Sequence, residues 1–387
     1  MNILIETIHS PYSGGRVGGA ETSLRLIAEK MTENGHTVFF ITKQQSKTLF
    51  GYSRKKIDGV EVITYSKFKF GILNRVRVKR ILASLKTKHH KFLIKKNKVE
   101  IVHTYYNFSL LRKYVCFKKE LDFKLIVRIA GLKLFEEIEK EGFRKKDQYV
   151  ELFNKVDQFN FISKGLFDLF HLKMKEYDFD FRFNNYFIKD IGVNLNKEIH
   201  LKDIIISKKR LDIVMVARFS DYQKRQDILV DAIAKLKNHN IHLTLIGEGP
   251  NKRILKKQVE FLEIQEFISF KPFVKKEILW DNLKHYDLLV HACEYEGLSK
   301  MIIESMAYGL PVLVSDVSPL NTYIKDEQNG FLVANDISAW AQKIEKLYLN
   351  QSLFPNVIKN ANHFIVKNYN ADENVFIYEN YFQTTLN

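Results

Sequence analysis

The stretch HACEYEGLSKMIIESMAYGLPVLVSD, residues 291–316, decides the fold. An apolar segment at residues 287–291 leads into it and predicts a short buried strand. Residues 300–308 are good helix formers and are followed by Gly309 and Pro311, which predicts a helix that ends there. Residues 311–315 predict another buried strand. A strand, a loop, a helix start and a strand in this order form a layout that can hold an anion, because the first helical N–H groups are unpaired.

Glu296 and Glu304 lie eight positions apart on either side of this junction between loop and helix. Two carboxylates beside an anion site would repel a phosphate, so we expect them to accept hydrogen bonds from hydroxyl groups. A ligand with phosphates in its middle and hydroxyls on both sides is a nucleotide-sugar.

Length and composition predict a cytoplasmic protein of two domains. The chain has 387 residues, of which 45% are hydrophobic and 13% aromatic, so wholesale disorder is excluded. Cys116 and Cys293 are too few for a disulfide framework or a thiolate zinc site. The start MNILIETIHS lacks the features of a signal peptide. No run approaches the ~18–20 apolar residues of a membrane span.

The net charge of +16 belongs to the first half of the chain. Residues 1–195 hold 37 Lys and Arg against 21 Asp and Glu, whereas residues 196–387 hold 24 of each. The densest basic stretch runs from Lys67 to Lys98, with twelve bases and no acid. It is either a solvated helix, or a surface that meets anionic lipid or an acidic acceptor. Nucleic acid is not an expected partner, because no nucleic-acid module accompanies the charge.

Short apolar strands alternate with helices in both halves, which predicts two doubly wound α/β domains with parallel sheets. We expect the first domain at residues 1–195, a linker at 196–209, the second domain at 210–357, and a helical tail at 358–387 that crosses back to the first domain. Sheets of this kind bind ligands at the carboxyl ends of their strands, so we expect these ends to face a shared cleft.

Two cations follow the first predicted strand of the second half. Arg218 comes directly after this strand, and Lys224 lies six residues further on. Both are therefore expected at the carboxyl end of a strand. Since no Asp cluster suits Mg²⁺, these cations could neutralise a departing diphosphate in place of a metal.

At these residues the chain resembles the family 4 retaining nucleotide-sugar glycosyltransferases, which adopt the GT-B fold. The signature of that family, roughly E-G-F-G-x-x-x-x-E-A-M-A-x-G-x-P-V, stands here from Glu296 to Val312. Its basic motif G-R-x-x-x-x-x-K-G corresponds to the segment from Ala217 to Arg225. Further matches cover nearly the whole chain in the same order: Gly18-Gly19-Ala20-Glu21, Gly35-His36, Asp190-Ile-Gly192-Val-Asn194 and Ile246-Gly-Glu-Gly249-Pro.

The resemblance implies a role for each matching residue. Arg218 and Lys224 would bind the donor's diphosphate and stabilise the leaving nucleotide. Glu304 would bind the ribose hydroxyls. Glu296 would hold the donor sugar. The contacts around them would come from glycines and backbone N–H groups, at Gly18, Gly19, Gly297, Leu298 and Ser299.

By the same resemblance the leaving phosphate oxygen takes the acceptor's proton while the hydroxyl attacks the same face of the sugar. Configuration is thereby retained, and neither a metal nor another cofactor is expected. Glu296 as a covalent nucleophile is the less favoured alternative.

The chain departs from the family pattern at several positions. Ala292-Cys293 stands where Pro-Ser is usual, and Ser299 and Arg225 replace glycines. None of these changes removes a charge. The segment Val127-Arg-Ile-Ala-Gly131 lacks the histidine that many members carry near the acceptor. Either Arg128 or the backbone at Ala130 is expected to face the site instead.

His103, at another strand end, is either an acceptor or sugar contact or a structural residue.

The sequence thus predicts a retaining glycosyltransferase that moves a sugar to a glycan or lipid-diphosphate acceptor in bacterial surface polysaccharide biosynthesis. It would act in the cytoplasm, at the inner face of the membrane. The alternatives are a nucleotide-sugar epimerase of GT-B type, or a non-catalytic protein that binds membrane or nucleic acid. An NAD-dependent dehydrogenase is disfavoured, because the first loop lacks Gly-x-Gly-x-x-Gly.

Overall fold

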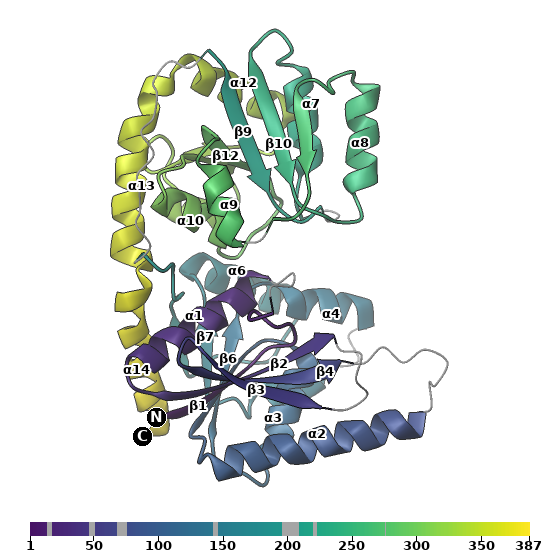
Figure 1. Ribbon diagram of the computed structural model, residues 1–387, viewed down its shortest axis with the longest axis vertical. Helices are drawn as coiled ribbons and strands as arrows, with labels where there is room; N and C mark the ends of the chain where they lie inside the picture. Colours follow the sequence, from purple (N-terminus) through teal and green to yellow (C-terminus); the bar gives the residue numbers. More distant parts are fainter. Residues whose placement is uncertain are drawn as a thin grey trace. The chain divides into compact units, whose positions relative to one another are not determined.

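The chain forms two compact units, which Figure 1 shows in a computed structural model. The structure describes residues 1–13, 18–45, 51–67, 76–141, 146–195, 209–219, 223–274 and 276–387. One unit consists of Met1–Ile191 with Ala371–Asn387, and the other of Gly192–Asn370. The predicted linker, residues 196–209, lies outside the described residues except for its last position.

The first unit is built on an eight-stranded sheet with the strand order β3-β4-β2-β1-β5-β6-β7-β8. Its strands are β1 (Asn2–Glu6), β2 (Thr37–Gln45), β3 (Tyr52–Ile57), β4 (Val60–Lys67), β5 (Ile101–Tyr105), β6 (Lys124–Ile129), β7 (Gln158–Phe161) and β8 (Tyr186–Ile188). Only β3 runs antiparallel to its neighbour. It escaped the sequence analysis because its residues are polar and exposed, which suits a strand at the edge of a sheet.

Helices cover both faces of this sheet, as Figure 1 shows. They are α1 (Gly19–Glu33), α2 (Val76–Lys96), α3 (Phe108–Phe117), α4 (Lys133–Glu141), α5 (Lys146–Phe153), α6 (Lys164–Glu176) and α14 (Ala371–Leu386). Helix α1 turns one apolar stripe toward the core, since Leu24 and Ile27 are fully buried. They share a core with Tyr378 and Phe382 of α14. The last helix is therefore an integral part of the first unit.

The second unit contains a six-stranded sheet, ordered β11-β10-β9-β12-β13-β14, in which all neighbours pair in parallel. Its strands are β9 (Leu211–Val216), β10 (Ile241–Ile246), β11 (Ile268–Lys271), β12 (Leu288–His291), β13 (Val312–Ser315) and β14 (Phe331–Val333). The helices are α7 (Gln226–Ala234), α8 (Lys252–Phe261), α9 (Lys276–Leu283), α10 (Lys300–Ala307), α11 (Leu320–Tyr323), α12 (Ile337–Leu349), a short 3₁₀ turn (Gln351–Leu353) and α13 (Phe354–Tyr369). The mixed α/β class and the doubly wound parallel sheets agree with the prediction.

The predicted helical tail is two helices that belong to different units. α13 closes the second unit, and α14 packs in the first. The backbone N–H of Val193 donates to the carbonyl of Tyr369 at 2.8 Å. Gly192 has a φ of +84°, and a Cβ there would lie 1.9 Å from the same carbonyl oxygen. Only glycine fits at this position, where the chain enters the second unit.

Candidate functional site

Two neighbouring strands of the second unit, β9 and β12, bring the predicted site residues together. They pair in parallel, so their carboxyl ends meet at one edge of the sheet. The segments that follow them also pair, since the N–H of Arg225 donates to the carbonyl of Ala292 at 3.0 Å and that of Glu294 to Gln223 at 3.0 Å. This short backbone ladder places Lys224 beside the loop that carries Glu296.

Lys224 and Glu296 form an ion pair, and His291 is its third member. Nζ of Lys224 lies 2.9 Å from Nε2 of His291, which lies 3.2 Å from Oε2 of Glu296. The side chains of Lys224 and Glu296 are only 12% and 17% exposed. Burial alone would raise the pKa of Glu296, but Lys224 and His291 outweigh it and lower the pKa to about 2. The carboxylate is therefore charged at neutral pH.

The sequence analysis placed these two charges on different parts of a ligand, and it did not single out His291. The structure shows that Lys224 and Glu296 bind each other directly in this state. His291 was interpreted as the last residue of a buried strand, which it is. A histidine at the carboxyl end of a parallel strand, five residues before the first signature glutamate, was the signal available.

Arg218 is exposed in the loop after β9, and it has no carboxylate partner among the described residues. The loop after β10 holds this segment in place. The N–H of Phe219 donates to the carbonyl of Glu248 at 3.2 Å. A Cβ on Gly249 would lie 2.0 Å from the carbonyl oxygen of Phe219. The Gly-Glu-Gly motif thus allows the close backbone approach that fixes Arg218.

The start of α10 follows Glu296 directly. Gly297, Leu298 and Ser299 connect the loop to the helix, and Ser299 caps it without a side-chain hydrogen bond. The backbone N–H groups at this helix start are thus not capped by the Ser299 hydroxyl, as an anion site requires. Glu304 lies in the second turn of α10 and is buried. The five residues that the sequence predicted here therefore all lie around the start of α10. They are Glu296, Gly297, Leu298, Ser299 and Glu304.

The two glycines predicted for the donor lie in the first unit. Gly18 caps α1 and Gly19 begins it, and both are exposed. The N–H of Gly18 donates to Oε2 of Glu21 at 3.1 Å. The Glu21 side chain therefore occupies this amide within the helix. The rest of the predicted glycine loop, residues 14–17, lies outside the described residues.

The expectation that His103 and Arg128 face an acceptor needs correction, because both are buried in the sheet under α14. Arg128 donates to Asn160 at 2.6 Å and to the hydroxyl of Tyr378 at 2.7 Å, and it pairs with Asp190. The Asp190 segment that resembles a family motif therefore anchors a buried guanidinium.

His103 packs edge-on against Phe382, with ring centroids 5.3 Å apart. Its burial and the nearby Arg128 lower its pKa to about 3, so the imidazole is neutral.

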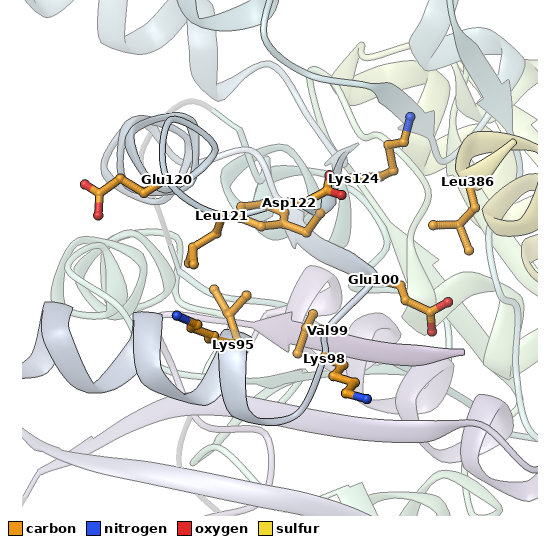
Figure 2. Close-up of a pocket in the computed structure, with 11 residues that line it drawn as sticks. Lys95, Lys98, Val99, Glu100, Glu120, Leu121, Asp122, Lys124 and Leu386 are labelled. Carbon is orange, nitrogen blue, oxygen red and sulfur yellow. The ribbon is translucent and has the colours of Figure 1, made fainter.

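A surface hollow of about 480 Å³ lies elsewhere in the first unit. Figure 2 shows its lining, which includes three lysines, Lys95, Lys98 and Lys124, and three acids, Glu100, Glu120 and Asp122. It sits where β5 and β6 begin, whereas doubly wound sheets bind ligands where strands end. We therefore assign it no part in the chemistry.

Helix α2 represents the described part of the basic stretch, of which residues 68–75 lie outside the described residues. Ile81, Leu85 and Phe92 are 59%, 50% and 55% exposed. Their spacing of four and seven places them on one face, away from the buried Leu93 and Ile94. Among the described helices, none is both long and apolar enough to cross a membrane. Among all the residues that the structure describes, no cluster of three or more His, Cys, Asp or Glu could hold a metal ion.

Comparison with known proteins points to a class. Residues 196–364, less than half of the chain, match the family glycosyl transferases group 1, so this stretch is similar to that family. An uncharacterized glycosyltransferase of Methanocaldococcus jannaschii is 28% identical over 188 residues, which are 47% of this chain and 47% of that protein. The O-antigen biosynthesis glycosyltransferase WbnH of Escherichia coli is 25% identical over 190 residues, 47% of this chain and 53% of that protein. The matched stretch thus spans about half the length of these curated relatives.

The solved structures confirm the fold over the whole chain. Anabaena HepE in complex with UDP and glucose superposes with a TM-score of 0.74 at 17% identity, covering 98% of this chain and 99% of that one. The fold is GT-B, as the resemblance implied.

Proposed function

We propose that the protein is a retaining glycosyltransferase that moves a sugar from a nucleotide-diphosphate donor to a glycan or lipid-linked acceptor. One observation carries the proposal. Lys224 and Glu296 form a largely buried charge pair at the carboxyl edge of the sheet, next to the exposed Arg218, in a unit that matches the group 1 family. Cations suit a diphosphate and carboxylates suit sugar hydroxyls, and both occur here side by side.

Each side chain has a distinct role in the proposal. Arg218 and Lys224 bind the diphosphate. Glu304 accepts hydrogen bonds from the ribose hydroxyls. Glu296 accepts them from the donor sugar, beside the backbone N–H groups of the Gly297–Ser299 segment. The buried setting strengthens these contacts compared with water.

The reaction breaks the bond between the anomeric carbon and the phosphate oxygen, and forms a bond from that carbon to the acceptor oxygen on the same face. The acceptor's proton passes to the leaving phosphate oxygen. Arg218 and Lys224 stabilise the negative charge that develops on the diphosphate, which is the contribution a metal makes in other enzymes. The proposal therefore needs no metal and no protein nucleophile.

The relatives suggest where to begin with substrates. WbnH is named for O-antigen biosynthesis, and HepE was solved with UDP and glucose. UDP-glucose is thus the first donor to test, and a bacterial surface polysaccharide or its lipid-linked precursor is the first acceptor class. On this proposal the enzyme works in the cytoplasm at the inner face of the membrane, and the basic first unit binds the acceptor.

The test is a donor panel followed by site variants. Thermal shift against UDP-glucose, UDP-N-acetylglucosamine, GDP-mannose and ADP-glucose identifies the donor. Arg218→Ala and Glu304→Ala should each lower transfer at least about a hundredfold, since each loses a charged contact worth about 3 kcal/mol. Arg253→Ala removes an exposed arginine of the same unit and should leave transfer unchanged.

The products decide between the alternatives. Proton NMR should show the donor's anomeric configuration in the product, and EDTA should not slow the reaction. Full activity of both site variants, or an inverted product, would falsify the assignment. Isomerisation of the donor without acceptor would instead indicate an epimerase.

We further propose that α2 rests on an anionic bilayer. Its exposed apolar stripe of Ile81, Leu85 and Phe92 lies on a helix whose described lysines include the exposed Lys88 and Lys95. Apolar side chains enter the acyl boundary while lysines meet the headgroups, at about 1 kcal/mol per lysine.

Vesicle sedimentation tests this surface. Phe92→Ser should weaken binding to phosphatidylserine vesicles about tenfold, as expected for roughly 1.4 kcal/mol of lost insertion. High salt should weaken the binding of the unchanged protein as well. Phe261→Ser, at a residue of α8 that is 87% exposed, is the matched control and should change nothing. Equal binding of both variants would reject a membrane role for α2.

A further inference from the structure

Two side chains contact the same carboxylate oxygen of Glu296. Lys224 pairs with Oε2, and Nε2 of His291 lies 3.2 Å from the same atom. Oε1 has no partner among the residues that the structure describes. One oxygen is thus held by the protein, and the other is available to a ligand hydroxyl.

The proton of His291 can be assigned from its surroundings. A lysine ammonium only donates, so Nε2 of His291 either accepts from Lys224 or donates to Glu296. Nδ1 is buried without a hydrogen-bond partner among the described residues. While Lys224 is in place, its ammonium donates to Nε2 at 2.9 Å, the shorter of the two contacts. Once the ammonium leaves, the neutral ring can carry its proton on Nε2 and donate it to Glu296.

A diphosphate that binds Lys224 must draw the ammonium away from Glu296. We propose that His291 is a positioning residue that keeps the Glu296 carboxylate charged and in place while Lys224 moves from Glu296 to the donor's diphosphate. This inference rests on the proposed function. In this role His291 contacts neither the donor nor the acceptor, because it acts through Glu296.

His291 suits this role because it stays neutral and donates one proton. Burial lowers the pKa of His291, Lys224 lowers it further, and Glu296 opposes both. The imidazole is thus an N–H donor without a charge of its own. It can remain at Glu296 in both states of the exchange.

Two other groups near the carboxylate, Cys293 and Tyr323, do not titrate near neutral pH. Burial raises the pKa of Cys293 to about 12 and that of Tyr323 well above its ordinary value, so both are protonated. Glu294 is paired with Arg225. If both Lys224 and His291 are withdrawn, Glu296 is the group that takes up a proton, because a buried carboxylate without donors becomes protonated.

Calorimetry of donor binding measures that proton. The nucleotide-sugar selected from the panel is titrated at pH 6 in two buffers of different ionisation enthalpy. These donors have no phosphate that titrates near this pH. The unchanged protein should take up no proton. His291→Phe keeps the ring volume without the N–H, and should take up roughly half a proton or more per donor bound. His291→Gln restores an N–H donor and should return the uptake to near zero.

The outcomes separate this inference from the proposed function. If the unchanged protein binds none of the four donors, the proposed function fails and the inference with it. If His291→Phe binds the donor without proton uptake, the inference alone is wrong. A merely structural role for His291 would lower the melting temperature of both variants without any change in proton uptake.

A measurement on the unchanged protein guards against a variant that does not fold. Nitrogen-15 NMR of labelled histidine should show the signal of His291, assigned by its loss in either variant, with the proton on Nε2 in the donor complex. A proton on Nδ1 in the donor complex would overturn the proposal.

Discussion

Replacing Lys224 by methionine should destabilise the second unit by about 3 kcal/mol at pH 7. The estimate follows from Glu296, whose pKa falls from its ordinary value of 4.5 to about 2 in the folded chain. Burial opposes this fall, and Lys224 is the largest favourable cause. Removal of one partner from a buried ion pair typically costs a similar amount.

The loss depends on pH with a defined sign. A lowered folded pKa stabilises the protein above pH 4.5, and this stability is lost as the pH falls toward 2. In Lys224→Met the pKa of Glu296 rises, so this contribution is already absent at pH 7. The difference between the two proteins should therefore shrink from about 3 kcal/mol at pH 7 to about 1.4 kcal/mol at pH 3 and less than about 0.5 kcal/mol at pH 2.

Tryptophan fluorescence isolates the relevant unit, because both tryptophans of the chain, Trp280 and Trp340, lie in it. Urea unfolding at several pH values gives the free energies, and thermal unfolding should show a decrease of roughly 6–12 °C at pH 7. Lys252→Met breaks a more exposed pair with Glu248 and should cost less than about 1 kcal/mol. Equal losses in the two variants, or a deficit that stays near 3 kcal/mol as the pH falls from 7 to 3, would refute the reasoning.

Three further substitutions test other parts of the fold. Gly249→Ala should weaken donor binding at least tenfold in a thermal-shift titration. The added Cβ would lie 2.0 Å from the carbonyl oxygen of Phe219 and would displace the loop after β9 that carries Arg218. Tyr378→Phe removes a hydroxyl that accepts from Arg128, and should destabilise the first unit by about 1–2 kcal/mol in chemical denaturation followed by circular dichroism. His103→Leu should leave activity unchanged and stability equal or up to about 1 kcal/mol higher, because both ring nitrogens are buried without a partner in the described structure.

Each of these predictions has a control or a contrary outcome. Gly131→Ala places a Cβ where no atom lies within 4 Å, and should leave donor binding intact. Tyr381→Phe alters a partly exposed tyrosine of the same helix as Tyr378 and should cost less. A hundredfold loss of transfer in His103→Leu would show that the imidazole takes part in the reaction after all.

The sequence predicted the framework because apolar strands and amphipathic helices are local patterns. The predicted strands at residues 287–291 and 311–315 and the predicted helix at 300–308 agree with β12, β13 and α10 to within one residue for this reason. β3 is built from polar residues and is held by its pairing with β4, which no local pattern reveals. The burial of single polar residues could not be predicted from local patterns either.

Arg128 shows why. Its partners Asn160, Asp190 and Tyr378 lie 32, 62 and 250 residues away. A strand residue that alternates with apolar neighbours can face either side of the sheet, and only the position of α14 decides which charge is covered. The motif around Glu296 and Glu304 could be predicted from the sequence because it is contiguous. The contact of Glu296 with Lys224 was not found, because it joins segments 72 residues apart.

Because Lys224 is paired with Glu296, Lys224 and Arg218 contribute differently to donor binding at the proposed site. Donor binding exchanges one ion pair for another at Lys224, so part of the new attraction offsets the loss of the old one. Arg218 makes no such exchange, since no described carboxylate holds it. On the proposed function, Arg218 therefore supplies more of the donor affinity. Lys224 instead keeps Glu296 charged and oriented until the diphosphate arrives. A cation that would otherwise be bound to water is thus already desolvated at the site, which lowers the reorganisation that transfer requires.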